Sequence, residues 1–472
     1  MKTNWWRVAL PLIVWLVIVL IPPPAGLKLN AWYYFAIFAA VVVALVLEPI
    51  PNAAVGLIGV TMAVVMGYVF AKPGDSLRWG LSGFSNSTVW LIFGAFMLSL
   101  GYEKTGLGRR IALLLVRALG GKTLGLGYAI TLADLAIAPG TPSNTARSAG
   151  TIYPIIRNIP PLFGSEPGPT SRKIGAYLMW TAFTATAITS SMFITSMAAN
   201  PLAISLIKQG TKLDITWGMW FLGFLPMAIV LLIFAPLLVY IIYPPELKTS
   251  KEVPIWARGE VNKLGTMTLK EIVMAAIVVL ALTLWIFGGS LVDATTVVII
   301  IISIMVITKI LDWNDILGHK QAWNVFIWFA TLVTLADGLG KVGFVTWAAK
   351  GIAGLMSGIS PLVIMTILVV FFFFVHYLFA SLTAHATAVL PVLLGVAVAI
   401  PGIPLLPFAM LLAYSLGVMG IISPYATGPA PIYYGCGFIS RIDFWKLGFI
   451  FGVIFLIVLL GIGMPYLTSV HV

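Results

Sequence analysis

One polar stretch interrupts the long apolar runs of this chain: APGTPSNTARSAGTIYP, residues 138–154. It places Ser143, Asn144 and Thr145 in a row, with Arg147 two positions later. Hydroxyl groups, a carboxamide and a guanidinium all donate hydrogen bonds, and together they can satisfy the oxygen atoms of a carboxylate. This set of residues therefore indicates the binding of an anion, and it contains no nucleophile with an adjacent base that would suggest catalysis.

A second polar stretch, FASLTAHAT at residues 379–387, repeats the first one 238 positions later. Ser381 and Thr383 correspond to the serine and the threonine of the first stretch. Leu382 takes the place of the asparagine, and His385 takes the place of the arginine. We expect both stretches to contribute to one anion site, although the same residues could also serve only as helix caps.

Two further polar breaks occur in both halves of the chain, TSMAANP with Thr195 and YATGPAP with Thr427, 232 positions apart. The motif EKTGL at residues 103–107 also matches GKVGF at residues 340–344, at an offset of 237. The common order and the nearly constant offset indicate an internal repeat. The two threonines are candidates to line the site, and the alternative is that they only shape a turn between helix halves.

The composition places these stretches in a membrane protein. Of 472 residues, 60% are hydrophobic and only 9% are charged, far below the quarter or so of a soluble domain. Apolar segments long enough for transmembrane helices recur along the chain and predict an all-α polytopic fold. The eleven expected spans are residues 8–26, 31–48, 52–71, 88–101, 173–194, 217–243, 271–288, 293–311, 323–337, 404–426 and 443–466.

Two apolar regions, residues 123–157 and 358–400, are too interrupted to be simple spans. If each is a re-entrant hairpin, 19 of the 27 Lys and Arg residues fall in loops on one side of the membrane. Cytoplasmic loops carry the excess of basic residues. We therefore expect the N-terminus inside and the C-terminus outside, in a bacterial inner membrane, and the net charge of +12 reports orientation rather than nucleic-acid binding.

Each repeat holds an odd number of spans plus a hairpin, so the second copy is inverted relative to the first. Inverted repeats with broken helices are typical of secondary transporters, with the substrate near the membrane midplane. Polar backbone at that depth is tolerated where it is buried in protein or lines a watery cavity. Helices that start after each hairpin tip would direct N–H groups and positive dipole ends at the same anion.

The ionisable residues in the hairpins leave two interpretations open. Arg147 could face the substrate, or it could pair with Asp134 across its own hairpin, because a charge in the membrane needs a partner or a cavity. His385 could carry a charge or donate to the substrate, or it could be a neutral buried histidine. His376, in the aromatic run FFFFVHY, is interpreted as helix packing.

Other functional classes find little support in the sequence. The single cysteine, Cys436, excludes a disulfide framework and a cysteine-based metal site. No HExxH motif, phosphate-binding loop or catalytic triad can be identified, so we expect neither an enzyme nor a bound cofactor or metal. A channel is a further alternative, but the broken helices favour alternating access.

These motifs resemble those of the divalent anion:sodium symporter family. The similarity covers the whole chain, and the wider context of both hairpins looks most like the exchanger branch, with its bacterial citrate/succinate antiporters and plastid 2-oxoglutarate/malate translocators. The resemblance implies a homodimer and an elevator mechanism. It also implies a scaffold of residues 1–87 and 245–322, and a transport domain of residues 88–244 and 323–472.

The chain departs from the symporter members of that family at the expected cation sites. Leu382 replaces an asparagine, and Arg147 and His385 add cationic or potentially cationic side chains next to both sites. We therefore expect sodium-independent exchange of dicarboxylates such as succinate, malate or 2-oxoglutarate, or of the tricarboxylate citrate. In this mechanism the arginine and the histidine replace the charge of sodium. The alternative is a sodium-coupled dicarboxylate symporter.

Overall fold

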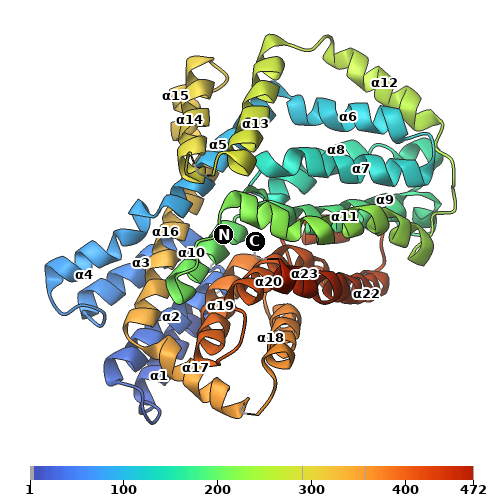
Figure 1. Cartoon of the computed structure of the whole chain (residues 1–472). Coiled ribbons are helices and arrows are strands. Elements are labelled where there is room, and N and C mark those ends of the chain that lie inside the picture. Colours follow the sequence, from blue (N-terminus) through green and yellow to red (C-terminus); the bar gives the residue numbers. More distant parts are fainter. Residues whose placement is uncertain (1–4, 290, 357, 471–472) are drawn as a thin grey trace.

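The computed structural model describes residues 5–289, 291–356 and 358–470, and all regular elements within these ranges are helices (Figure 1). Eight of them are long and apolar enough to cross a membrane, and shorter apolar helices of 10–17 residues accompany them. Each of the eleven expected spans coincides with a helix. The prediction of an all-α polytopic membrane protein is confirmed.

The first half of the chain runs from three N-terminal helices through a polar hairpin to a long helix. Its helices are α1 (Trp5–Leu20), α2 (Leu29–Leu47), α3 (Asn52–Met66), α4 (Pro73–Gly80), α5 (Ser87–Thr105), α6 (Leu107–Leu119), α7 (Thr123–Ile137), α8 (Tyr153–Ile156), α9 (Gly175–Met192), α10 (Ala199–Thr211) and α11 (Trp217–Ile242). An amphipathic connector, α12 (Glu252–Leu264), leads to the second half.

The second half repeats this order. Its helices are α13 (Leu269–Phe287), α14 (Ala294–Ile307), α15 (Trp313–Gly318), α16 (Lys320–Lys341), α17 (Phe344–Leu355), α18 (Pro361–Val375), α19 (Leu382–Ala399), α20 (Leu405–Val418), α21 (Ala430–Gly435), α22 (Arg441–Val458) and α23 (Met464–Ser469). Region 123–157 folds as α7, a tight turn, a π-helical stretch and α8, and region 358–400 as α18, a turn and α19.

The two halves pack against each other in a reciprocal way. Helix α3 of the first half lies against α16, and α14 of the second half lies against α5. Both contacts are made close by glycine: a Cβ on Gly56 would overlap Thr331, and a Cβ on Gly94 would overlap Val298. Small residues let helix backbones approach closely in membranes. Since Gly94 and Thr331 are 237 positions apart, the offset found in the sequence also relates the two contacts in space.

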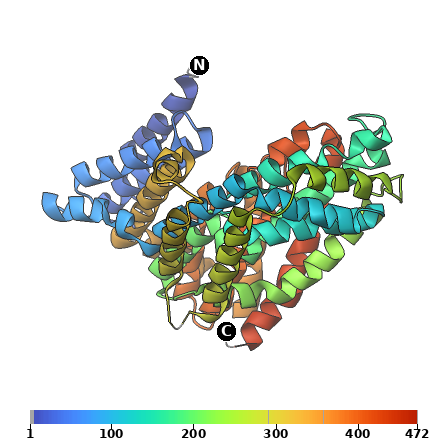
Figure 2. The ribbon, with the colours of Figure 1, turned by 90° about the horizontal axis from the view of Figure 1, so that it is seen from above.

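Buried side chains form two clusters. The smaller one joins α1–α4 to α16 and the start of α17, and these helices lie together on one side of the molecule in Figure 2. The larger one contains both hairpins and the long helices, with α6, α7, α9 and α11 packed in sequence (Figure 1). The polar tips of the hairpins are therefore held inside the larger cluster.

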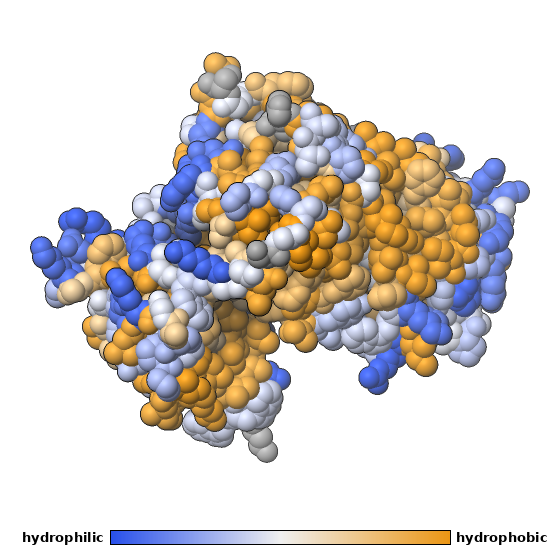
Figure 3. Space-filling model, turned by 60° about the horizontal axis from the view of Figure 1, so that its bottom comes forward, coloured by the Kyte–Doolittle hydropathy of each residue, from blue (hydrophilic) through white to orange (hydrophobic). Residues whose placement is uncertain are grey.

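The surface matches a membrane environment. Large apolar side chains are exposed on many helices, among them Ile241, Phe287 and Leu355. Figure 3 shows a broad hydrophobic surface with hydrophilic residues gathered towards its edges. Contiguous apolar surface of this extent would promote aggregation in water, whereas in a bilayer it contacts lipid.

Candidate functional site

The first hairpin reverses direction through a short polar turn. Helix α7 ends at Ile137, and the chain re-enters a helix at Thr145. The hydroxyl of Ser143 accepts a hydrogen bond from the backbone N–H of Ala146 at 3.1 Å, so it caps this second limb. The limb begins as a π-helix over Thr145–Ile152. π-Helical turns are rare and occur frequently at functional sites.

The second hairpin is built in a similar way. After α18, a 3₁₀ turn over His376–Leu378 and an extended segment lead into α19. Ser381 caps α19 through its hydroxyl, which accepts a hydrogen bond from the N–H of Ala384 at 3.3 Å. Leu382 and Thr383 follow in the first turn and are buried. The capping role and a substrate role of these serines are compatible, because a cap uses only part of a hydroxyl's hydrogen-bonding capacity.

Both broken helices lie next to the hairpins. Helices α9 and α10 are separated by a segment that contains Thr195, whose hydroxyl donates to the carbonyl of Pro139 in the first hairpin. Helices α20 and α21 are separated by a segment that contains Thr427, which is buried. The polar breaks that the sequence indicates are therefore interruptions between helix halves, and each lies against a hairpin.

The break between α20 and α21 brings the candidate residues of the two halves together. Asn144 donates from its amide nitrogen to the hydroxyl of Thr427 at 2.8 Å. Thr145 lies directly against Gly428, where a Cβ would overlap its hydroxyl. The carbonyl of Ala426, directly before Thr427, lies 2.7 Å from Nε2 of His376 in the second hairpin. Both hairpins thus contact the same unwound segment, although the structure records no direct hydrogen bond between Ser381 or Thr383 and the first tip.

Arg147 adopts the second of the two arrangements left open by the sequence. It is fully buried, and its Nε lies 3.1 Å from the carboxylate of Asp134 on the facing limb. Its two Nη1 hydrogens go to the carbonyls of Thr141 and Ser196, at 3.2 and 2.6 Å. Its Nη2 donates to two hydroxyls of α9, those of Thr189 and Ser190, at 3.1 and 3.0 Å.

This network uses all five N–H donors of the guanidinium. Asp134 is equally engaged, because it also accepts from the hydroxyls of Thr186 and Thr189. The positive charge of Arg147, which the sequence suggested as a partner of the substrate, is therefore balanced by the carboxylate of Asp134 within the same hairpin. The pair ties α7, the π-helical limb, α9 and the first break into one unit.

His385 is joined to a second histidine. Its Nδ1 lies 3.0 Å from Nδ1 of His376, and its ring packs between Phe372 and Phe379. Since the Ala426 carbonyl only accepts, Nε2 of His376 carries a proton. In a neutral His376 the Nδ1 atom then accepts, and His385 donates to it. This assignment leaves Nε2 of His385 as a buried acceptor without a partner among the described residues.

The two hairpins follow one plan with different chemistry. In each, a side chain two residues after the tip threonine, Arg147 or His385, bonds a partner on the first limb. Each pair also donates to a carbonyl of the break in its own half, that of Ser196 or Ala426. The interpretation of His376 as simple helix packing was wrong, because its two ring nitrogens bond the facing limb and the break.

A cavity of about 670 Å³ reaches the first hairpin between α5, α6 and α12. Ala146 lies in its wall, as do Trp256 and Glu260 of α12. Glu260 pairs with Arg109 at 3.0 Å. A hydrogen bond from Lys263, together with Arg109, holds the pKa of the Glu260 carboxyl below its ordinary value. Ala146, next to the tip, thus lines the same cavity as the connector helix α12.

The described residues contain no group of three or more His, Cys, Asp or Glu side chains that could hold a metal ion. The donors at the tips are hydroxyls, one amide and helix N-termini, a set that suits carboxylate oxygens. Two capped hairpins that contact one broken helix inside an all-helical apolar chain define an integral membrane protein with the architecture of a secondary transporter.

The chain belongs to the sodium:sulfate symporter family, whose transmembrane-region model matches residues 2–472. The resemblance to the divalent anion:sodium symporters is thereby confirmed, and with it a role in transport rather than catalysis. The L-tartrate/succinate antiporter of Escherichia coli strain K12 is 47% identical over 482 residues, covering 99% of both chains. Antiporters of the same name from Shigella flexneri and E. coli O157:H7 match equally.

The fold is also similar to a solved structure. The crystal structure of the Alcanivorax borkumensis YdaH transporter superposes with a TM-score of 0.56 at 15% sequence identity, covering 84% of this chain and 89% of that one. At this identity the likeness concerns the fold alone.

Proposed function

We propose that this protein is a dicarboxylate antiporter that works without sodium. The proposal is supported by full-length similarity to L-tartrate/succinate antiporters and by the donors at the first hairpin tip. L-Tartrate and succinate are the first substrates to consider, followed by malate, 2-oxoglutarate and citrate. Ser143, Asn144 and Thr145 would bind one carboxylate, with Thr427 beside them. Ser381 and Thr383 would bind the other, with Leu382 in the wall and Thr195 fixing the first break.

The observation that carries the sodium-independent part is the use of backbone carbonyls near both tips. Carbonyl oxygens are typical ligands of hard cations in transporters with unwound helices. Here Nη1 of Arg147 donates to the carbonyls of Thr141 and Ser196, and His376 donates to that of Ala426. A protein N–H group already uses one lone pair of each of these oxygens, and a cation bound to those beside Arg147 would lie next to its buried guanidinium.

The charge of the substrate would then be met by dipoles rather than by an unpaired cation. Arg147 and Asp134 together carry no net charge, and His385 contributes charge only when a second proton binds. Hydroxyls, the Asn144 amide and the N–H groups at the helix starts remain as donors. Hydrogen bonds from these donors to a bound dianion would be worth about 1.5–3 kcal/mol each, because the acceptor is charged. This gain exists only in the loaded site, which favours return with a second dianion and hence exchange.

We further infer an elevator-type movement within a homodimer, with the N-terminus inside. The proposed transport unit is residues 88–244 and 323–472, and the scaffold is residues 1–87 and 245–322. Several contacts cross this boundary, and one of them is a buried ion pair: Arg110 of α6 bonds Glu271 of α13 and also donates to the carbonyl of Gly265.

Counterflow in proteoliposomes tests the substrate class. Vesicles are loaded with one unlabelled anion each, and uptake of radiolabelled succinate is measured. We expect internal L-tartrate, succinate or malate to drive uptake, and internal lactate, a monocarboxylate of similar size, to be inactive. Sulfate serves as the control for the other substrate in the family description. Uptake driven by sulfate but by none of the dicarboxylates would overturn the proposal.

A further inference from the structure

Two cavities of the molecule are related by the internal repeat. The first is the 670 Å³ cavity at the first hairpin. The second, of about 480 Å³, lies between α10, α16, α17 and α19. Several of their wall residues stand 237 positions apart: Arg109 and Thr346, Leu113 and Lys350, Pro154 and Pro391. Since the repeats are inverted, the two cavities are expected to open to opposite faces of the membrane.

The second cavity is backed by the second hairpin. Helix α19 begins at the tip with the capping Ser381, and its later turns form one wall of the cavity through Pro391 and Gly395. The opposite walls come from α16 and α17. A solute in this cavity would thus lie along the limb that leads to the proposed carboxylate site.

The cavities differ in charge. Three lysines line the second one, Lys212, Lys341 and Lys350, against a single acid, Asp337. Lys341 is paired with that acid at 2.8 Å. Within the described part of the chain, Lys350 takes part in no salt bridge, and the ammonium of Lys212 contacts only a backbone carbonyl, that of residue 209, at 3.2 Å. The second cavity therefore presents two uncompensated positive charges.

The first cavity lacks this property. Its one basic side chain, Arg109, is paired with Glu260, and Glu103 adds a further negative charge. Arg109 of the first cavity corresponds in the repeat to Thr346 of the second, and Leu113 corresponds to Lys350. The difference in charge is therefore a property of particular wall residues and is not inherited from the repeat.

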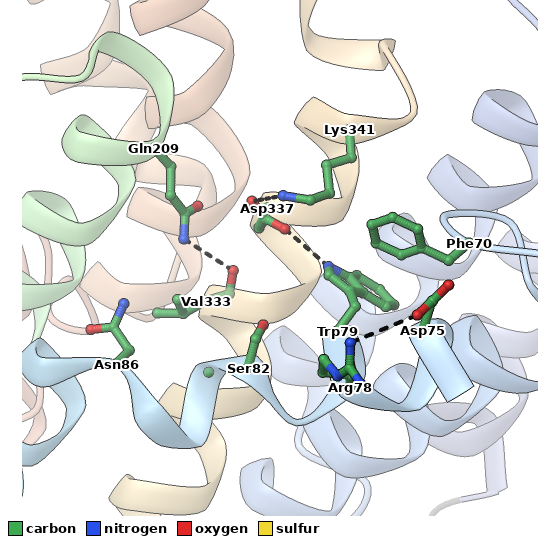
Figure 4. Close-up of a pocket in the computed structure, with 11 residues that line it drawn as sticks. Phe70, Asp75, Arg78, Trp79, Ser82, Asn86, Gln209, Val333, Asp337 and Lys341 are labelled. Carbon is green, nitrogen blue, oxygen red and sulfur yellow. Dashed lines mark hydrogen bonds and ion pairs between the residues drawn. The ribbon is translucent and has the colours of Figure 1, made fainter. Parts of the chain in front are cut away.

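A neighbouring cavity of about 540 Å³ extends the second one towards α4. The two share Gln209, Asp337 and Lys341 as wall residues. Figure 4 shows the bonded Asp337 and Lys341 beside this neighbouring cavity, with Trp79 donating to the same carboxylate at 2.9 Å. Trp79 and Lys341 thus hold the carboxylate of Asp337 in place, so that it does not pair with Lys212 or Lys350.

We propose that the 480 Å³ cavity is a collecting site for dicarboxylates on the outer face, with Lys212 and Lys350 as its charged groups. Its volume lies in the range of small-molecule sites. A cleft lined by charge of one sign raises the local concentration of the opposite ion and its rate of association. The inference rests on the proposed function, and it adds an asymmetry: the outer face captures dianions electrostatically, whereas the inner face does not.

The test measures both faces separately. Succinate exchange is followed in right-side-out and in inverted membrane vesicles, for the wild type and for Lys212→Gln and Lys350→Gln. At low ionic strength, each substitution should raise KM for external succinate about fivefold, the effect of one charge about 8 Å from a dianion in water. The maximal rate and the internal KM should not change. The difference should shrink as salt is added, because screening shortens the range of the interaction.

Lys208→Gln is the matched control. Lys208 lies one turn before Lys212 on α10, pairs with Asp214 at 2.6 Å, and does not line the cavity. Its substitution should leave external KM unchanged. Equal effects on both faces, an effect on the inner face alone, or unaltered KM in both variants would overturn the collecting site. Wild-type exchange of succinate would continue in all three cases, so these results are distinct from failure of the proposed function.

Discussion

We expect replacement of Arg147 to act mainly by lowering the stability of the protein rather than by removing a contact with the substrate. In Arg147→Met, the carboxylate of Asp134 stays buried with only the hydroxyls of Thr186 and Thr189 as donors. Breaking a buried ion pair from one side costs about 3–5 kcal/mol, because an uncompensated charge remains. The carbonyls of Thr141 and Ser196 lose their donors as well. We expect the single variant to lose thermal stability in detergent and exchange activity together.

The double variant Asp134→Leu/Arg147→Met separates structure from substrate charge. Replacing both partners by apolar groups of similar size is often close to neutral for stability. We expect the double variant to regain most of the lost thermal stability and a measurable part of succinate exchange, since the net charge of the hairpin is unchanged. Melting in detergent and counterflow in proteoliposomes provide the two readouts. A double variant that melts like the wild type yet shows no exchange would refute this reasoning and make the charge of Arg147 itself essential.

Three further changes probe the site and the frame around it. Asn144→Ala removes an amide donor proposed for the substrate together with the 2.8 Å bond to the second half, so it should weaken apparent succinate affinity by about 1–3 kcal/mol and also lower thermal stability, as counterflow and melting would show. Arg110→Ala leaves Glu271 buried without its partner and should lower stability by about 3–5 kcal/mol in a melting assay. Ala146→Cys, in a Cys436→Ala background, should react with thiol reagents from both faces and be protected by substrate. Unchanged affinity in Asn144→Ala, unchanged melting in Arg110→Ala, or labelling of Ala146→Cys from one face under all conditions would contradict the respective expectation.

Most of the fold follows from local patterns in the sequence. Apolar runs of sufficient length mark all eleven helices that were expected, because a helix needs about 20 apolar residues to span the hydrocarbon core of a bilayer. The hairpins could be located because Pro, Gly and polar residues interrupt regions 123–157 and 358–400. The offset of 237 predicted which helices correspond, and the reciprocal packing of α3 on α16 and α14 on α5 agrees with it.

The partners of the ionisable residues could not be derived in the same way. The sequence favoured a substrate as the partner of Arg147 and left Asp134 as the alternative, and the choice depends on α9, which approaches the hairpin and supplies two hydroxyls. His376 lies in an aromatic run that resembles ordinary packing, while the carbonyl that it bonds is 50 residues away in the chain. Contacts of this kind depend on tertiary structure. A useful signal was nonetheless present, since each hairpin carries an ionisable residue on both limbs.

The central claim, exchange without sodium, is tested most directly by uptake of labelled succinate into proteoliposomes that contain the purified protein. Vesicles are prepared empty or loaded with unlabelled succinate, and the external salt is that of sodium, potassium or choline. We predict uptake only into loaded vesicles, at the same rate in all three salts, because protein N–H groups donate to the carbonyls beside both hairpin tips. Uptake into empty vesicles driven by an inward sodium gradient would contradict the account and identify a sodium-coupled symporter.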